Sequence, residues 1–163
     1  MAATFRRVGG DRIRLRLAPQ EAELLRGLPE QLRSTLGDRG DPVNRRLLPP
    51  AYLQPEDAEA DAEYRRLMHD DLLAAKLANA DLVTATLERG ELRARRWTVE
   101  LSEEEALAWL GVLNDVRLAL GVRLDITEDY DGVVDPLDPR APAMHLLSYL
   151  GWLEEQLVEA LAR

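Results

Sequence analysis

Apolar and polar residues alternate in three short stretches of this chain, which predicts strands with one buried and one exposed face. The stretches are 4–8, 12–17 and 97–101. Within 12–17 the odd-numbered positions are apolar and the even-numbered positions are arginine, so the arginines share one face. Gly9 and Gly10 separate the first two stretches and tolerate a tight turn, which predicts a hairpin.

Apolar residues recur at three- and four-residue steps in longer segments, which predicts amphipathic helices. These helices are expected over 19–36, 56–88, 103–121 and 142–161, with loops over 37–55 and 122–140. Pro29 is expected to kink or split the first helix near Gly27–Leu28, and a break is expected near Met68–His69 in the second. Ser102 and Glu105 have the spacing of a capping box before the third.

One part of the chain is repeated. Residues 12–37 and 96–121 align without a gap, and Gly27/Gly111 and Gly37/Gly121 are among the identical pairs. Each copy passes from a strand through a cap into a helix that ends at Gly, which predicts two strand–helix–helix units (about 12–88 and 96–163) around a pseudo-twofold axis. We therefore predict one α+β domain over 1–163, mostly helical, with a small antiparallel sheet of about three strands packed against helices.

Composition narrows the possible functions. The 163 residues include no Cys, which excludes thiolate catalysis, zinc–sulfur sites and disulfide switching. A net charge of −9 argues against general nucleic-acid binding. We find neither an apolar run of the roughly 20 residues that span a membrane nor a signal peptide, and we expect a cytoplasmic protein.

The sequence offers little evidence for catalytic or metal-binding residues. The acidic loop 122–140 overlays part of a calcium-binding loop but has Thr127 at the first ligand position, so a solvated loop is the preferred interpretation. His69 and His145 lack the spacing of a zinc site, and no serine lies in a Gly-x-Ser-x-Gly elbow. We therefore predict a protein that is not an enzyme and needs no metal or cofactor.

The strand arginines are the first candidate binding group. The repeat extends their row by one residue, so that the row comprises Arg12, Arg14, Arg16 and Arg96. A basic row on an acidic chain could bind phosphate or an acidic protein surface. The alternative is that Glu91 and Glu100 neutralise it. We rank neutralisation first, an acidic protein partner second and DNA third.

Polar residues within the predicted helices form a second candidate group: Asp71, Lys76, Asn79, Asn114, Asp115 and Arg117. Asn114 lies at the edge of an apolar stripe, where a buried amide would need partners. An ion-pair network between Arg117 and Asp71, with Lys76 nearby, is the first interpretation. A ligand or partner site is the second.

Four segments resemble one known family. They are FRRVGGDRIRLRL, EYRRLMHDDLLAAKLANAD, WLGVLNDVRLALGVRLDI and DPRAPAMHLLSYLGWLEEQLVEAL. In this order they are similar to the actinobacterial oxidative stress regulator family, also catalogued as a domain of unknown function. The most distinctive parts are Leu113–Gly121 and Leu150–Leu153.

The resemblance implies a non-enzymatic regulator that acts through protein–protein interaction. A relative is described as a thiol-switched partner of a stress sigma factor, and such proteins are encoded near a Clp-protease adaptor and a cysteine-synthesis system. The expected partner is therefore a sigma factor or RNA polymerase. An accessory role in Clp proteolysis or cysteine biosynthesis is the alternative, and an unrecognised hydrolase comes last. An exposed strand edge can pair with a second copy of the chain, so a homodimer is a further possibility. Because this chain has no Cys, it cannot use a thiol switch.

Overall fold

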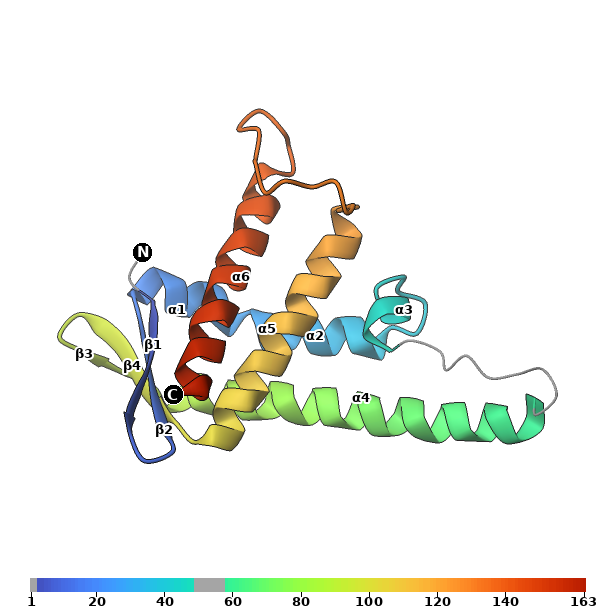
Figure 1. Ribbon diagram of the computed structural model, residues 1–163, viewed down its shortest axis with the longest axis horizontal. Helices are drawn as coiled ribbons and strands as arrows, with labels where there is room; N and C mark the ends of the chain where they lie inside the picture. Colours follow the sequence, from blue (N-terminus) through green and yellow to red (C-terminus); the bar gives the residue numbers. More distant parts are fainter. Residues whose placement is uncertain (1–2, 49–57) are drawn as a thin grey trace.

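The sheet lies at one end of the molecule and the helices extend from one of its faces, as Figure 1 shows for the computed structural model. The structure describes residues 3–48 and 58–163. In chain order the elements are β1 (Thr4–Gly9), β2 (Arg12–Leu17), α1 (Pro19–Arg26), α2 (Leu28–Gly37), α3 (Asn44–Leu47), α4 (Ala58–Arg89), β3 (Glu91–Arg93), β4 (Arg96–Leu101), α5 (Glu103–Arg123) and α6 (Ala141–Ala162). The fold is α+β and mostly helical, as predicted.

The sheet is antiparallel with the strand order β1-β2-β4-β3. The two copies of the repeated strand, β2 and β4, pair with each other at its centre. Leu15 faces Val99, which is also its counterpart in the repeat. A twofold axis between these two residues would produce this register. The superposition of the complete halves stays a prediction.

The sheet has four strands, where we predicted about three. The additional strand, β3, contains only three residues, all exposed. Its hairpin turn places Ala94 and Arg95 at positive φ, 48° and 63°. A strand this short and polar has no hydrophobic alternation, so the sequence pattern does not reveal it.

The helix boundaries follow local sequence signals. The predicted split near Gly27–Leu28 is confirmed, because α1 ends at Arg26 and α2 begins at Leu28. The second copy has Leu113 where the first has Pro29, and α5 continues without a break. The predicted break near Met68–His69 is wrong. Residues 58–89 contain neither Gly nor Pro, so nothing in the chain interrupts α4.

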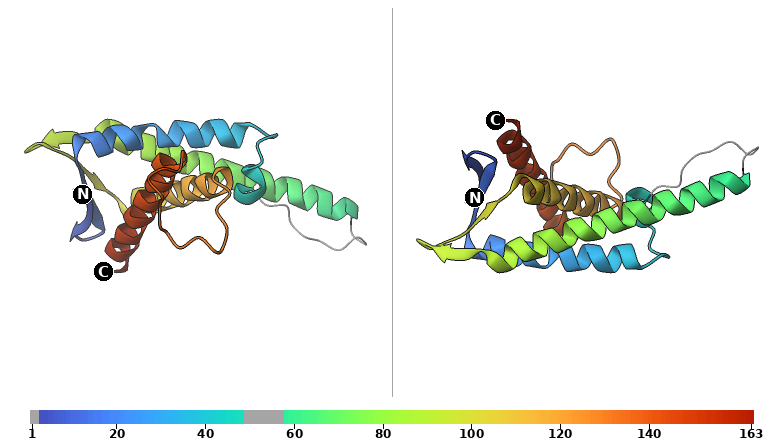
Figure 2. Two further views of the ribbon diagram at one scale, coloured as in Figure 1. Left: turned by 90° about the horizontal axis from the view of Figure 1, so that it is seen from above. Right: turned by 90° about the horizontal axis from the view of Figure 1, so that it is seen from below.

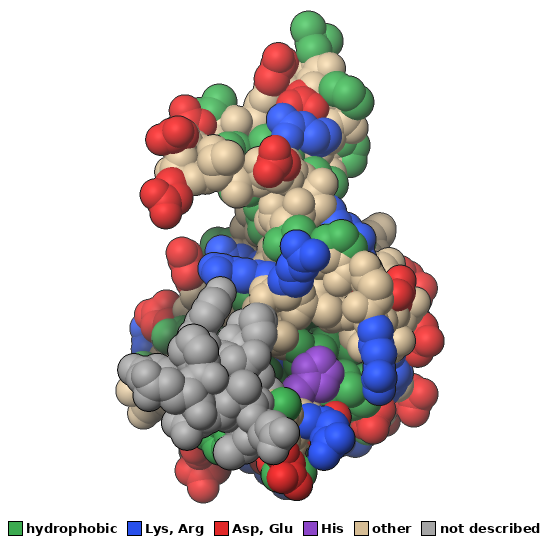
Figure 3. All heavy atoms as spheres, turned by 90° about the vertical axis from the view of Figure 1, so that its right-hand side faces the viewer, with side chains coloured by type: hydrophobic (Ala, Val, Ile, Leu, Met, Phe, Trp, Pro, Cys, Tyr) green, Lys and Arg blue, Asp and Glu red, His purple; other side chains and the backbone are tan. Residues whose placement is uncertain are grey.

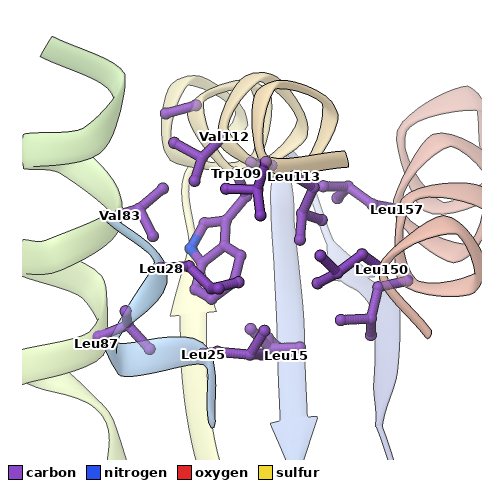
Figure 4. Close-up of a cluster of buried hydrophobic side chains, with 14 of the residues drawn as sticks. Leu15, Leu25, Leu28, Val83, Leu87, Trp109, Val112, Leu113, Leu150 and Leu157 are labelled. Carbon is purple, nitrogen blue, oxygen red and sulfur yellow. The ribbon is translucent and has the colours of Figure 1, made fainter. Parts of the chain in front are cut away.

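The core lies between the sheet and the helices. Trp109 of α5 points toward the sheet, with Val83 and Leu87 of α4 on one side and Leu150 and Leu157 of α6 on the other (Figure 4). The apolar residues of β2, Ile13, Leu15 and Leu17, are all 0% exposed. Burial of this size is the main stabilising contribution to folding.

The polar end of the central indole is satisfied inside the core. Its Nε1 donates a 2.9 Å hydrogen bond to the hydroxyl of Thr86, and this hydroxyl in turn donates to the carbonyl of Val83 at 2.8 Å. Thr86 and Asp115 are the two buried polar residues of the described part of the chain.

The long helix α4 runs beneath the others and projects beyond them, and the two views of Figure 2 show this from above and below. The C-terminal end of α6 lies near the sheet, beside β1 (Figure 1). Among the helices of the described residues, none carries an apolar stretch long enough to span a bilayer.

Candidate partner-binding site

The face of the sheet opposite the core is rich in arginine. Residues that pair across antiparallel strands share a face, so the strand registers place six arginines and two glutamates on this surface, which we call the arginine face. They are Arg6, Arg12, Arg14, Arg16, Arg93, Arg96, Glu91 and Glu100. The strand alternation that buries Ile13, Leu15 and Leu17 turns the intervening arginines outward.

The two glutamates neutralise part of this face. The Nη2 of Arg14 donates a 2.8 Å hydrogen bond to Glu100, and Arg12 lies 4.0 Å from the same carboxylate. The hydrogen bond from Arg14 is the main reason why the pKa of Glu100 is lowered. Glu91 binds Arg93 at 3.0 Å.

The remaining arginines are not neutralised. Arg6 lies directly opposite Arg14, and like charges in this position repel each other. Arg16 has Thr4 and Thr98 on its two sides. Among the described residues, neither Arg6 nor Arg16 has a carboxylate within ion-pair distance, and the buried Nε of Arg96 has no hydrogen-bond partner. Arg6 was not among the arginines predicted from the sequence. A two-residue turn at Gly9–Gly10 would align Arg6 with Ile13, whereas the observed register, which shifts between Arg7 and Gly9, places Arg6 opposite Arg14.

The arginine face continues around the edge of β1 into a hollow of about 640 Å³. The hollow is closed by the end of α6, where Arg163 and Glu159 lie. Arg7 holds this end in place by donating to the carbonyls of Ala160 at 3.3 Å and Leu161 at 3.2 Å. No local sequence signal reports such a contact, because it joins the two ends of the chain.

The predicted polar group divides into separate contacts. Lys76 of α4 binds Asp115 of α5 at 2.7 Å, and their side chains are 16% and 4% exposed. Burial raises the pKa of Asp115, and the hydrogen bond from Lys76 opposes this shift. Asn79 lies against Gly111, where an added Cβ would approach its Nδ2 to 2.8 Å. These contacts join α4 to α5.

One expectation about this group is wrong. Arg117 pairs with Glu154 of α6 at 2.5 Å and not with Asp71, which is exposed on α4. Asn114, whose burial the sequence left open, is exposed. The helical period placed Asn114 at the edge of a stripe, but the packing angle of α6 against α5 decides on which side of that edge it lies.

The histidines and the acidic loop contain no metal cluster. His69 and His145 are both exposed. In the loop, side chains of Asp131 and Asp135 accept hydrogen bonds from backbone amides two residues later, at 2.9 Å each, as in Asx turns. Across the described ranges, no group of three His, Asp or Glu could hold a metal ion. Figure 3 shows acidic side chains over the projecting end where this loop lies.

Comparison with known proteins places these features in a family. Residues 1–161 match the family described as "Domain of unknown function (DUF2017)". Proteins named "Oxidative stress regulator AosR" from Mycobacterium bovis and Mycobacterium tuberculosis are each 31% identical over 184 aligned residues, covering 91% of this chain and 82% of theirs. A Mycobacterium leprae relative is 31% identical over 193 residues, covering 93% and 83%. No solved structure matches. The chain therefore belongs to the DUF2017 family.

Proposed function

We propose that this chain is a regulatory protein that binds an acidic surface of a protein partner through the arginine face. The observation that carries the proposal is the position of Arg6 opposite Arg14 on an exposed surface, in a chain of net charge −9. Two facing arginines repel each other unless carboxylates lie between them. Glu100 neutralises one side of Arg14 only, so an acidic partner would complete the row.

The partner that we propose is a sigma factor or a subunit of RNA polymerase. The names of the mycobacterial relatives, which designate an oxidative stress regulator, support a regulatory role. A component of Clp proteolysis or of cysteine biosynthesis is the alternative partner. The net negative charge disfavours direct binding to DNA. Because the chain has no Cys, regulation by a disulfide within it is not part of the proposal.

The test combines crosslinking and titration. A photo-crosslinking residue at Thr98, between Arg16 and the edge strand, should capture the partner, whereas the same residue at Leu137, which is 90% exposed on the loop, should not. The purified candidates are a stress sigma factor, core RNA polymerase, a Clp adaptor and cysteine synthase from the same organism. The triple substitution Arg12→Gln, Arg14→Gln and Arg16→Gln should weaken the captured complex by about tenfold or more, most strongly at low salt.

A second triple variant controls for the change in net charge. Arg26, Arg39 and Arg45 are exposed and lie outside the sheet, and their replacement by Gln removes the same three charges. This control variant should bind as the wild type does. Equal affinities for the two triple variants, with both folded by circular dichroism, would reject the arginine face as the binding site.

A further inference from the structure

A second candidate binding site lies between α5, α6 and the loop that joins them. The cavity there has a volume of about 860 Å³, which is within the range of small-molecule sites. Its wall includes residues from both segments that distinguish the family resemblance, Leu113–Gly121 and Leu150–Leu153. These segments are distant in sequence, and the packing of α6 on α5 brings them together. In Figure 3 the loop overhangs a hollow, with Lys or Arg side chains below it.

Two buried hydrogen-bond donors of this cavity wall have no partner among the described residues. They are the Nε of Arg117 and the hydroxyl of Tyr130. The Nη1 of Arg117 is held by Glu154 at 2.5 Å, which fixes the orientation of the guanidinium. Buried polar groups in native proteins are nearly always satisfied, so these two donors need an acceptor that the described residues do not supply.

The rest of the wall defines the kind of acceptor. Arg46, from α3, and the amide of Asn114 add donors beside Arg117, and Leu118, Ile126 and Trp152 add apolar surface. Asp125 and Glu155 also line the cavity, and both are exposed. Arg46 and Asn114 are exposed as well, so the buried polar atoms of this wall without a partner are the two donors of Arg117 and Tyr130. This combination suits a ligand with an anionic group and an apolar body.

Two glycines of the cavity wall have different roles, one in contact with Arg117 and one facing open space. A Cβ at Gly151 would lie 3.3 Å from the Nη2 of Arg117, so the helix backbone packs closely against the guanidinium. A Cβ at Gly121 would meet nothing within 4 Å, so a side chain at this position would extend into the cavity. Gly37, its counterpart in the repeat, also has open space around it and does not line the cavity.

We propose that this cavity binds a small organic anion, a carboxylate or phosphate monoester on an apolar or aromatic body. Arg117, Tyr130 and Arg46 donate hydrogen bonds to the anionic group. Leu118 and Trp152 contact the apolar body. This site lies on helices and loop and is independent of the arginine face.

Titration of the full chain with four probes tests the proposal. The probes are phenyl phosphate, benzoate, inorganic phosphate and benzyl alcohol. Binding is followed by amide chemical shifts of the cavity residues and by tryptophan fluorescence, to which Trp152 contributes together with Trp97 and Trp109. Phenyl phosphate or benzoate should bind with a Kd of about 1 mM, a value typical of fragment-sized ligands. Benzyl alcohol, which lacks the charge, and inorganic phosphate, which lacks the apolar body, should each bind at least about tenfold more weakly. No saturable shift with phenyl phosphate or benzoate, or equal affinity for inorganic phosphate, would overturn the assignment.

Two matched pairs of variants locate the site. Arg46→Gln should weaken phenyl phosphate binding by about tenfold, whereas Arg45→Gln, one residue earlier and outside the cavity, should leave it unchanged. Gly121→Leu should fill the cavity and abolish binding, whereas Gly37→Leu should not. Both leucines replace a helical glycine, which favours the helix, so loss of folding is not expected. Unchanged binding in the folded Gly121→Leu variant would refute the site.

Discussion

Lys76, the only lysine of the chain, donates a 2.7 Å hydrogen bond to Asp115, whose side chain is 4% exposed. The pair joins α4 to α5 beside the core. Removing one partner of a buried pair leaves the other charge without compensation, which costs much more than an exposed pair contributes.

Lys76→Gln should therefore lower the free energy of unfolding by about 3 kcal/mol at pH 7, measured by urea denaturation. Arg33→Gln is the comparison, because Arg33 pairs with Asp81, which is 70% exposed, and its loss should cost less than about 1 kcal/mol. The double substitution Lys76→Met, Asp115→Leu should recover most of the stability. If it remained as unstable as the single variant, an uncompensated charge would not be the cause.

The same pair has a defined pH dependence. Burial raises the pKa of Asp115 in the folded state above the ordinary value of 3.8. Between the raised pKa and the ordinary value, the folded protein therefore binds more protons than the unfolded chain. Protonation of Asp115 therefore favours the folded state. Without Lys76 this pKa should rise further, and the stability deficit of Lys76→Gln should shrink as pH falls from 7 to 5. A deficit that stays constant with pH would contradict this assignment.

The two copies of the repeat have different residues at the helix cap, and each residue can be replaced by the one in the other copy. Ser102 accepts a hydrogen bond from the Glu105 amide at 3.1 Å, whereas its counterpart Ala18 has no side chain to do so. Both residues have extended backbone geometry. Ser102→Ala should lower the stability by about 1 kcal/mol, and Ala18→Ser should raise it by a similar amount.

Thermal denaturation of both variants measures the effect of the cap. The exposed Ser34, within α2, is the control, and Ser34→Ala should change the stability by less than about 0.5 kcal/mol. If Ala18→Ser were destabilising, the local geometry of the first copy would not be equivalent to that of the second.

The ion pair on the arginine face should be visible by titration. The hydrogen bond from Arg14 is the largest cause of the lowered pKa of Glu100, so Arg14→Gln should raise this pKa toward its ordinary value. Arg12→Gln, which removes the more distant arginine, should raise it less. Carboxyl-carbon NMR follows both titrations. Because the folded pKa is lowered, the small stabilising contribution of the pair exists above the unfolded pKa and is lost as pH falls through the folded one.

Peroxide should modify the protein without switching it. Met68 is 48% exposed and Met144 is 5% exposed, so Met68 should form its sulfoxide first. Intact-mass and peptide-mass measurements would follow the reaction, and Met1 lies outside the described residues. A change in oligomeric state that dithiothreitol reverses would contradict the prediction, because the chain has no Cys.

The parts of this fold that the sequence predicts are those with strong local patterns. The alternation around Leu15 and the capping box at Ser102 predicted elements that the structure confirms. The features that the sequence did not predict either depend on contacts between distant segments or lack a hydrophobic pattern. β3 is too short for alternation, the exposure of Asn114 depends on how α6 packs, and Arg117 binds Glu154 from a helix that pattern alone does not orient.

The same limit applies to the candidate site. Strand alternation placed Arg12, Arg14 and Arg16 on one face. It could not show that Glu100 neutralises Arg14 while Arg6 remains opposite, because that depends on strand order and register. The register is decided by long-range pairing, for which a single sequence carries no direct signal.

The central pairing of β2 with β4 has an evolutionary consequence. A half-length ancestor with the first copy's strand could have formed the same sheet as a symmetric dimer, in which Arg14 would face Arg16 of the other subunit. Fusion of two genes into one chain removes that restriction, because the copies can then diverge. Position 100, the counterpart of Arg16, is now Glu, and it binds Arg14 at 2.8 Å. The present chain thus has unlike charges at a contact that exact twofold symmetry would make repulsive.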